Sequence, residues 1–335
     1  MNPNELETYL YSVASQRLPL SLMIWGPPGV GKSSIVRSVS AREGIGIQDL
    51  RLSQLAPTDL RGLPVPEDGV SRWYPPEFLP RSGEGIIFLD EINMAPPAMQ
   101  GVAQQLILDR KVGSYSVPDG WLIWAAGNRK SDRASVYDMP SALGNRFIHL
   151  NVEPDVDSFK RWAIENRLAE SILAFLSFRP QLLHRIDPQH NNWPSPRSWV
   201  MAHQLLGAGL DVAPAIGDAA AGEYRAFCAV YNDLPDLDAI VAGNAGASRF
   251  LKEPSARYAI ILGLTVRAKT PEQTVHALRW LIGKAGPEWL QLFFNDVFRK
   301  LREDGQFGEF ARLASGDAAI KEFLADNRSV LSGTA

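Results

Sequence analysis

A short run of residues near the amino end of the chain has the composition of a loop that binds phosphate. The run follows the spacing G-x-x-x-x-G-K-[ST] and consists of Gly26, Pro27, Pro28, Gly29, Val30, Gly31, Lys32 and Ser33. Its glycines let backbone amides curl round a phosphate without a Cβ clash, and a helix that starts there adds the positive end of its dipole. Lys32 can then reach the β- and γ-phosphates of a nucleotide, and the Ser33 hydroxyl can ligate Mg²⁺. We expect this loop and the following Ser34 to bind a nucleoside triphosphate.

A second group of reactive residues ends an apolar run further along the chain. Residues 86–89 are Ile-Ile-Phe-Leu, and the carboxylates Asp90 and Glu91 follow directly. A buried strand would deliver both to the carboxyl edge of a sheet, where open α/β folds bind ligands. There Asp90 would hold Mg²⁺ through water, and Glu91 would orient or deprotonate the attacking water. An acidic strand end on its own is commonly a solvated turn, so the functional interpretation depends on its pairing with the glycine-rich loop.

Three further polar residues sit where they can complete such a site. Asn128 follows the apolar run 121–126 and can bind the attacking water or the γ-phosphate, although a plain Gly-Asn turn is the alternative. Arg146 precedes the run 147–152, where an arginine is ordinarily a surface charge but can also reach a neighbouring subunit's nucleotide. Arg197 begins a helix, which is an unfavourable place for a cation. We therefore expect an anionic partner for Arg197, either a nucleotide phosphate or a carboxylate in a structural salt bridge.

Alternating strand and helix patterns must position these residues. Compact apolar runs predict buried parallel strands at residues 20–25, 85–90, 121–126 and 147–152, and alternating leucines predict another at 48–53. Helical periodicity covers residues 32–42 and 97–110. This order predicts a parallel sheet with helices on both faces. It also gives the glycine-rich loop a strand before it and a helix after it, a context that a chance glycine turn would lack.

The strand patterns fade after about residue 155, and the rest of the chain has helical periodicity. We therefore place the end of an α/β nucleotide-binding domain at residue 154. Residues 155–207 form a helical segment, and residues 208–335 form a helical extension that is a candidate partner-binding region. Breaks are expected at residues 283–287 and 305–308, which contain glycine and proline or paired glycines.

Composition excludes several other classes of protein. The 34 Lys+Arg and 37 Asp+Glu give a net charge of -3, which argues against a strongly basic nucleic-acid binder but not against a local basic channel. A single cysteine excludes a disulfide framework and a cysteine-based zinc site, and the histidines lack ligand spacing. No run approaches the roughly 18 apolar residues of a membrane span, and no signal peptide is evident. We expect a cytoplasmic protein.

The motifs in their order resemble the AAA+ ATPases over roughly residues 5–207: GPPGVGKS, IIFLDE, AAGN, GNRF and SPRS. Two inserted hairpins and the sequence EINMA resemble the MoxR-like branch of that family more closely. The first hairpin would turn at residues 67–69, and the second would lie between residues 110 and 120. The resemblance implies a P-loop NTPase sheet, an α-helical lid at 155–207 and a further mostly helical region. It also implies Mg²⁺-dependent hydrolysis of ATP to ADP, and a ring, commonly hexameric, with nucleotide between subunits.

The resemblance also assigns roles to single residues by motif match, namely Lys32, Ser33, Asp90, Glu91, Asn128, Arg146 and Arg197. One departure concerns Arg146, because Asn145 stands where the branch has an aspartate, and this puts the orientation of the arginine in question. Related rings that carry such inserts can use the lid arginine in trans. The subunit whose nucleotide Arg197 contacts is therefore left open.

These observations favour a MoxR-like molecular chaperone or remodelling ATPase. The resemblance implies a protein client, and often a partner of the von Willebrand factor A type. Trp73 and Tyr74 on the first hairpin are candidates for client contact, with local packing as the alternative. A nucleic-acid-dependent motor or restriction-type nucleotidase is a second hypothesis, disfavoured by the acidic composition. A nucleotide-binding scaffold without turnover is a third, disfavoured by the Asp90-Glu91 pair.

Overall fold

The computed structural model describes residues 1–132, 136–231 and 233–326, and its chain forms two compact units. The first contains residues 1–159 and 195–197, and the second contains residues 160–194 and those from 198 onward. The finer division at residues 154 and 207 stays a prediction.

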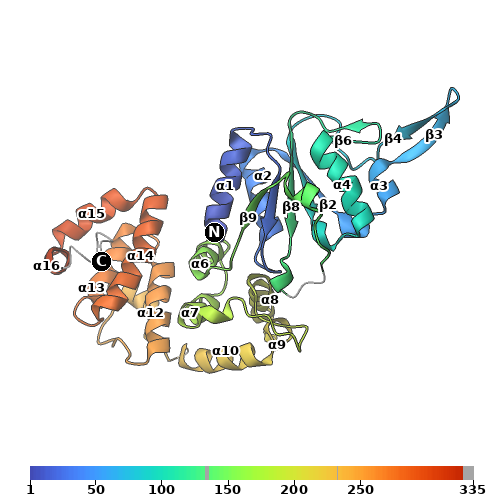
Figure 1. The fold of residues 1–335 in the computed structure, drawn as a ribbon. Helices are drawn as coiled ribbons and strands as arrows, with labels where there is room; N and C mark the ends of the chain where they lie inside the picture. Colours follow the sequence, from blue (N-terminus) through green and yellow to red (C-terminus); the bar gives the residue numbers. More distant parts are fainter. Residues whose placement is uncertain (133–135, 232, 327–335) are drawn as a thin grey trace. The chain divides into compact units, whose positions relative to one another are not determined.

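Within the described residues, five parallel strands form the sheet of the first unit, in the order β2-β5-β8-β1-β9 (Figure 1). The strands are β1 (Leu22–Trp25), β2 (Gly46–Arg51), β5 (Gly85–Asp90), β8 (Trp121–Gly127) and β9 (Ile148–Asn151). The expected fold class is confirmed. The expected bounds of β2 were wrong, because the alternation of Leu50 and Leu52 continues past the strand. Leu52 is fully buried in the 3₁₀ turn η1 (Leu52–Gln54) and not in the sheet.

Helices cover both faces of this sheet, as Figure 1 shows for α1 and α2 on one side and α4 on the other. The helices and 3₁₀ turns are α1 (Pro3–Ser15), α2 (Lys32–Glu43), α3 (Pro57–Arg61), η2 (Ile92–Met94), α4 (Pro97–Asp109), η3 (Lys130–Asp132) and α5 (Ser141–Gly144). Strand β5 contributes to both faces, since Ile86 and Phe88 pack with α1 and α2 while Ile87 and Leu89 pack with α4. This two-sided burial fixes the strand that ends in Asp90.

Two antiparallel hairpins extend the first unit. The first pairs β3 (Leu63–Glu67) with β4 (Val70–Tyr74) across the turn Asp68-Gly69, and the second pairs β6 (Lys111–Val112) with β7 (Tyr115–Ser116). Both were expected from the sequence. The first projects from its unit (Figure 1), and its Leu63, Val70 and Tyr74 are 71%, 58% and 54% exposed.

The base of the first hairpin rests against the second. Ser114 donates a hydrogen bond to the carbonyl oxygen of Trp73. The residue Trp73 is only partly exposed. Pro64 and Pro66 lie opposite Trp73 and Ser71 in the register, where the backbone nitrogens of β3 face away from β4. Of the two aromatic candidates, Tyr74 is therefore exposed and Trp73 packs locally.

The second unit is helical within the described residues. Its helices are α6 (Val156–Glu165), α7 (Glu170–Phe178), α8 (Pro196–Gly207), α9 (Ala213–Ile216), α10 (Asp218–Tyr231), α11 (Leu237–Val241), α12 (Pro254–Arg267), α13 (Pro271–Leu281), α14 (Pro287–Glu303), α15 (Phe307–Gly316) and α16 (Ala318–Asp326), with a 3₁₀ turn η4 (Pro180–Leu182). The first residues of α6 and α8 belong to the first unit. Both expected breaks occur, before α14 and before α15. Among the described helices, none is long and apolar enough to cross a bilayer.

Candidate functional site

The glycine-rich loop connects β1 to α2 at the carboxyl edge of the sheet. Gly31 precedes α2 with a φ of 105°, a backbone conformation that favours glycine. The buried Val30 anchors the loop in the core between sheet and helices, and Ser34 is exposed in the first turn of α2. The sequence therefore places a glycine-rich loop between a buried strand and a helix, with its backbone amides at the start of α2.

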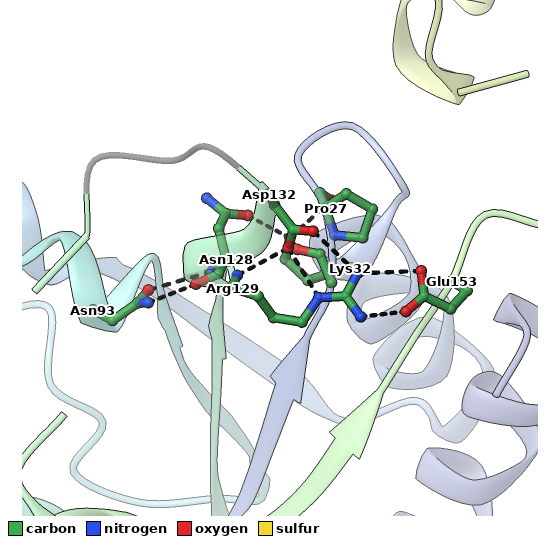
Figure 2. A network of polar contacts seen from close by, with 8 residues as sticks. Pro27, Lys32, Asn93, Asn128, Arg129, Asp132 and Glu153 are labelled. Carbon is green, nitrogen blue, oxygen red and sulfur yellow. Dashed lines mark hydrogen bonds and ion pairs between the residues drawn. The ribbon is translucent and has the colours of Figure 1, made fainter. Parts of the chain in front are cut away.

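Lys32 is buried and spans the loop and the neighbouring strand (Figure 2). Its Nζ donates to the carbonyl oxygens of Gly26 and Pro27, at 2.7 and 3.1 Å, and to Oδ1 of Asn128 at 2.8 Å. These acceptors match the three donors of an ammonium group. Burial lowers the pKa of Lys32 to about 8, although the Asp90 carboxylate opposes this change. The ammonium group is thus held at the sheet edge without a directly bonded anion.

Ser33 and Asp90 meet at the same edge. The Ser33 hydroxyl donates to Oδ2 of Asp90 at 2.6 Å, and Oδ1 of Asp90 accepts from the backbone N–H of Glu91 at 3.0 Å. These oxygen atoms suit Mg²⁺, which is typically bound by one or two protein oxygens together with substrate phosphates and water. No group of three acidic, histidine or cysteine side chains that could hold a metal occurs among the described residues. The donor set therefore fits an ion shared with a nucleotide and not one caged by protein alone.

Glu91 leaves β5 in a left-handed backbone conformation, with a φ of 54°. Such a conformation is strained for a residue with a side chain and is often found at functional sites. It ends the strand directly after Asp90 and starts η2. The two adjacent carboxylates consequently belong to different local structures, with Asp90 bonded to the loop serine and Glu91 half-buried beside it.

Asn128 directly follows β8 and is held by a residue that the sequence analysis did not single out. Asn93 in η2 donates from Nδ2 to the backbone oxygen of Asn128 at 2.7 Å, and its Oδ1 accepts from the backbone N–H of Asn128 at 3.3 Å (Figure 2). Both asparagines are buried. In the sequence, Asn93 is an ordinary polar residue two positions after Glu91, and its burial became evident only from the structure.

Arg129 forms a second network beside Asn128 (Figure 2). Its guanidinium pairs with Asp132, with Nε to Oδ2 at 3.0 Å, and with both carboxylate oxygens of Glu153 after β9. The hydrogen bond to Glu153 is the main cause of a raised pKa of Arg129, and the same bond lowers the pKa of Glu153. Nothing in the sequence spacing predicts this network, because its members come together only when β8 and β9 are placed.

The two expected arginines differ in their surroundings. Arg197 donates its backbone N–H to the carbonyl oxygen of Gly29 at 3.3 Å, and its positive charge contributes to lowering the pKa of Lys32. No ion pair of Arg197 is found among the described residues, although its charge acts on Lys32 of the same loop. Arg146 is exposed after α5 and makes no hydrogen bond or ion pair with the other expected site residues that the structure describes. Its role toward a neighbouring subunit stays a prediction.

The five-stranded parallel sheet with its glycine-rich loop has the AAA+ P-loop NTPase fold. Residues 21–147 match the model of the AAA domain (dynein-related subfamily), which is less than half of the chain. No curated protein matches the chain. The MoxR-like assignment is not tested by these findings.

Solved structures show only distant similarity. One of NtrX from Brucella abortus has 16% identity and a TM-score of 0.38, over 64% of this chain and 51% of that one. The NtrX complex with ATP has 15% identity and a TM-score of 0.43, over 90% and 67%. A point mutant of RuvB from Thermotoga maritima has 15% identity and a TM-score of 0.35, over 87% and 81%. The chain thus spans about half of the first NtrX chain, and at these TM-scores the similarities say nothing about function.

Proposed function

We propose that the protein is a Mg²⁺-dependent ATPase that converts ATP and water to ADP and phosphate. The observation that carries this proposal is the meeting of three segments at one sheet edge. The Ser33 hydroxyl bonds Asp90 at 2.6 Å, and the Lys32 ammonium bonds Asn128 at 2.8 Å. Loop, acidic strand end and neighbouring strand end are therefore already in contact where a triphosphate would lie.

Each of these residues would have its own role in binding or hydrolysing the nucleotide. Lys32 exchanges its carbonyl acceptors for the β- and γ-phosphates, and Ser33 and Asp90 hold Mg²⁺, the latter through water. Held there, the ion would supply positive charge to offset that of the phosphates. Glu91 orients or deprotonates the attacking water, and Asn128 contacts that water or the γ-phosphate.

The two arginines would supply the remaining charge. Arg197 lies at the loop, where a phosphate would give it the anionic partner that it lacks among the described residues. Arg146 is exposed just before the amino end of β9, which runs parallel to β1, so it lies at the sheet edge opposite the glycine-rich loop and would reach the nucleotide of an adjacent subunit. This arrangement requires a homo-oligomeric ring, of which a hexamer is the form we propose.

We further propose that hydrolysis drives remodelling of a protein client, as in MoxR-like chaperones, in the cytoplasm and with a partner of the von Willebrand factor A type. The first hairpin supports a client-contact role, since it exposes Leu63, Val70 and Tyr74 together. A nucleic-acid-dependent motor is the alternative. Hydrolysis that is stimulated by DNA or RNA, with a steep salt dependence, would favour that alternative.

Two substitutions test the ATPase proposal on the purified full chain. Lys32→Ala should abolish nucleotide binding, and Glu91→Gln should bind ATP without turnover, measured by equilibrium titration and phosphate release. Glu84→Gln is the matched control, because Glu84 is exposed just before the amino end of the same strand and should leave hydrolysis unchanged. Normal ATP affinity in Lys32→Ala, or full turnover in Glu91→Gln, would contradict the proposal.

A further inference from the structure

The side chain of Asn93 replaces a missing strand at the end of β8. The ladder between β5 and β8 ends at the pair Leu89 and Ala125, because Glu91 turns the chain out of the sheet. Beyond that pair, the described part of the chain gives the backbone of Asn128 no strand partner on the β5 side. The Asn93 amide supplies both bonds, donating to the Asn128 oxygen and accepting from its N–H, and is only 3% exposed.

Gly127 is the second half of this arrangement. A Cβ atom at position 127 would lie 2.5 Å from Oδ1 of Asn93 and 2.7 Å from Cε of Met23. Position 127 is not among the glycines with positive φ, so its backbone conformation does not require glycine. The requirement is space, which is filled by the Asn93 amide and by the end of the Met23 side chain, a flexible group that can shift aside. The motif Gly127-Asn128 and the residue Asn93 are therefore two parts of one contact.

The same asparagine anchors the segment that carries Glu91. Asn93 follows Glu91 by two residues, and its backbone oxygen accepts from the N–H of Tyr137 at 2.7 Å. Its side chain and its main chain thus fix η2 from two sides. A left-handed residue such as Glu91 persists only where its surroundings hold it. Glu91 is held directly by its N–H bond to Asp90 Oδ1 and by the Met94 N–H bond to its oxygen, and the bonds of Asn93 fix the turn that follows.

We propose that Asn93 is a positioning residue for hydrolysis, which holds Glu91 and Asn128 at a fixed separation without contacting the nucleotide. This inference rests on the proposed ATPase function. Asn93 acts on the backbone of Asn128 and leaves its side chain to bond Lys32. Because it makes none of the contacts of Lys32, Ser33 or Asp90, its loss should affect the chemical step and not nucleotide binding.

The first test separates kcat from binding in the full chain. Asn93→Ala should lower kcat by about 100-fold, the scale expected when a reacting group is misplaced by about 1 Å, with KM and the Kd for ADP unchanged. Asn93→Asp keeps the shape and the acceptor but loses the donor, and should fall between wild type and Asn93→Ala. It also serves if Asn93→Ala does not fold.

A matched control separates positioning from lost stability. Ser40 is a buried polar residue of the same unit whose hydroxyl bonds the oxygen of Ile45 at 2.7 Å, next to the amino end of β2. Ser40→Ala should lower the thermal midpoint while leaving kcat unchanged. An equal loss of kcat in Ser40→Ala, or a parallel loss of nucleotide affinity in Asn93→Ala, would overturn the inference.

A double-mutant cycle provides the second test. Gly127→Ala should lower kcat much as Asn93→Ala does, because the new methyl group displaces the amide. The double variant should be no slower than Asn93→Ala alone, since alanine at position 93 makes room for that methyl group. Multiplying effects would overturn the inference. A wild-type chain without ATPase activity would overturn the proposed function together with it, whereas an active wild type and an active Asn93→Ala would overturn the inference alone.

Discussion

Nucleotide affinity should fall with rising pH because Lys32 loses its proton more easily in the free protein than in the complex. Burial lowers the pKa of Lys32 to about 8 from 10.5. A bound phosphate would provide an anionic partner and return the pKa to about 10.5 or higher. Binding therefore requires the protonated lysine, and the free protein gives up that proton as the pH passes through 8.

The size of the effect follows from linkage. At pH 7 about nine tenths of the free protein carries the proton, and at pH 9 only about one tenth does, so the Kd should rise about 10-fold between these two pH values. At pH 9 binding should take up about 0.9 proton. The sign is fixed by the direction of the shift, because a complex with the higher pKa is favoured at the lower pH.

The assay is calorimetric titration of the full chain with ADP at pH 7, 8 and 9, in two buffers of different ionisation enthalpy and with EDTA. Mg²⁺ is left out because its own charge at the adjacent Ser33 and Asp90 would change the field. Lys32→Arg is the control, since a guanidinium stays charged over this range and should give a nearly constant Kd. A wild-type Kd that does not change from pH 7 to pH 9 would refute the reasoning.

Three further predictions concern other parts of the site. Arg146→Ala should bind ATP but not hydrolyse it. If Arg146 serves the nucleotide of a neighbouring subunit, mixing Arg146→Ala with Glu91→Gln subunits should restore turnover. If mixing restores nothing, Arg146 serves the nucleotide of its own subunit. Ser33→Ala should lower the apparent affinity for Mg²⁺ by about 10-fold or more, measured as a rise in the Mg²⁺ concentration that gives the half-maximal rate. Glu153→Gln should cost about 0.5 kcal/mol of unfolding free energy at pH 7, because its ion pair with Arg129 is largely exposed. The folded pKa of Glu153 is lowered from 4.5, so this difference should vanish as the pH falls through the folded value, as urea unfolding at several pH values would show.

Local patterns allowed most of the fold to be predicted. Buried runs such as residues 85–90 predicted strands because sterics and burial act within a few residues, and the Asp68-Gly69 turn has the chemistry of a tight hairpin. The end of β2 was misplaced because Leu52 keeps the apolar alternation while the backbone leaves the sheet. Periodicity records burial and not hydrogen bonding, so it could not detect that change.

The site was predictable where one motif carries its own geometry and not where distant segments meet. The loop at residues 26–33 specifies its backbone through glycines, so Lys32 and Ser33 could be assigned from spacing. The contact of Asn93 with Asn128 and the pairing of Arg129 with Glu153 arise only from the strand order. A sequence shows such residues as ordinary polar side chains until the sheet is assembled.

The prolines of the first hairpin limit the pairing of its edge strands with other molecules at high protein concentration. An exposed apolar ribbon would ordinarily recruit further strands along its open edge and seed fibres. Pro64 and Pro66 remove the outward amide hydrogens of β3, and Ser114 occupies the outward oxygen of Trp73 on β4. Neighbouring strands therefore find fewer backbone donors on β3 and fewer acceptors on β4, while Leu63 and Tyr74 stay exposed on one face of the hairpin.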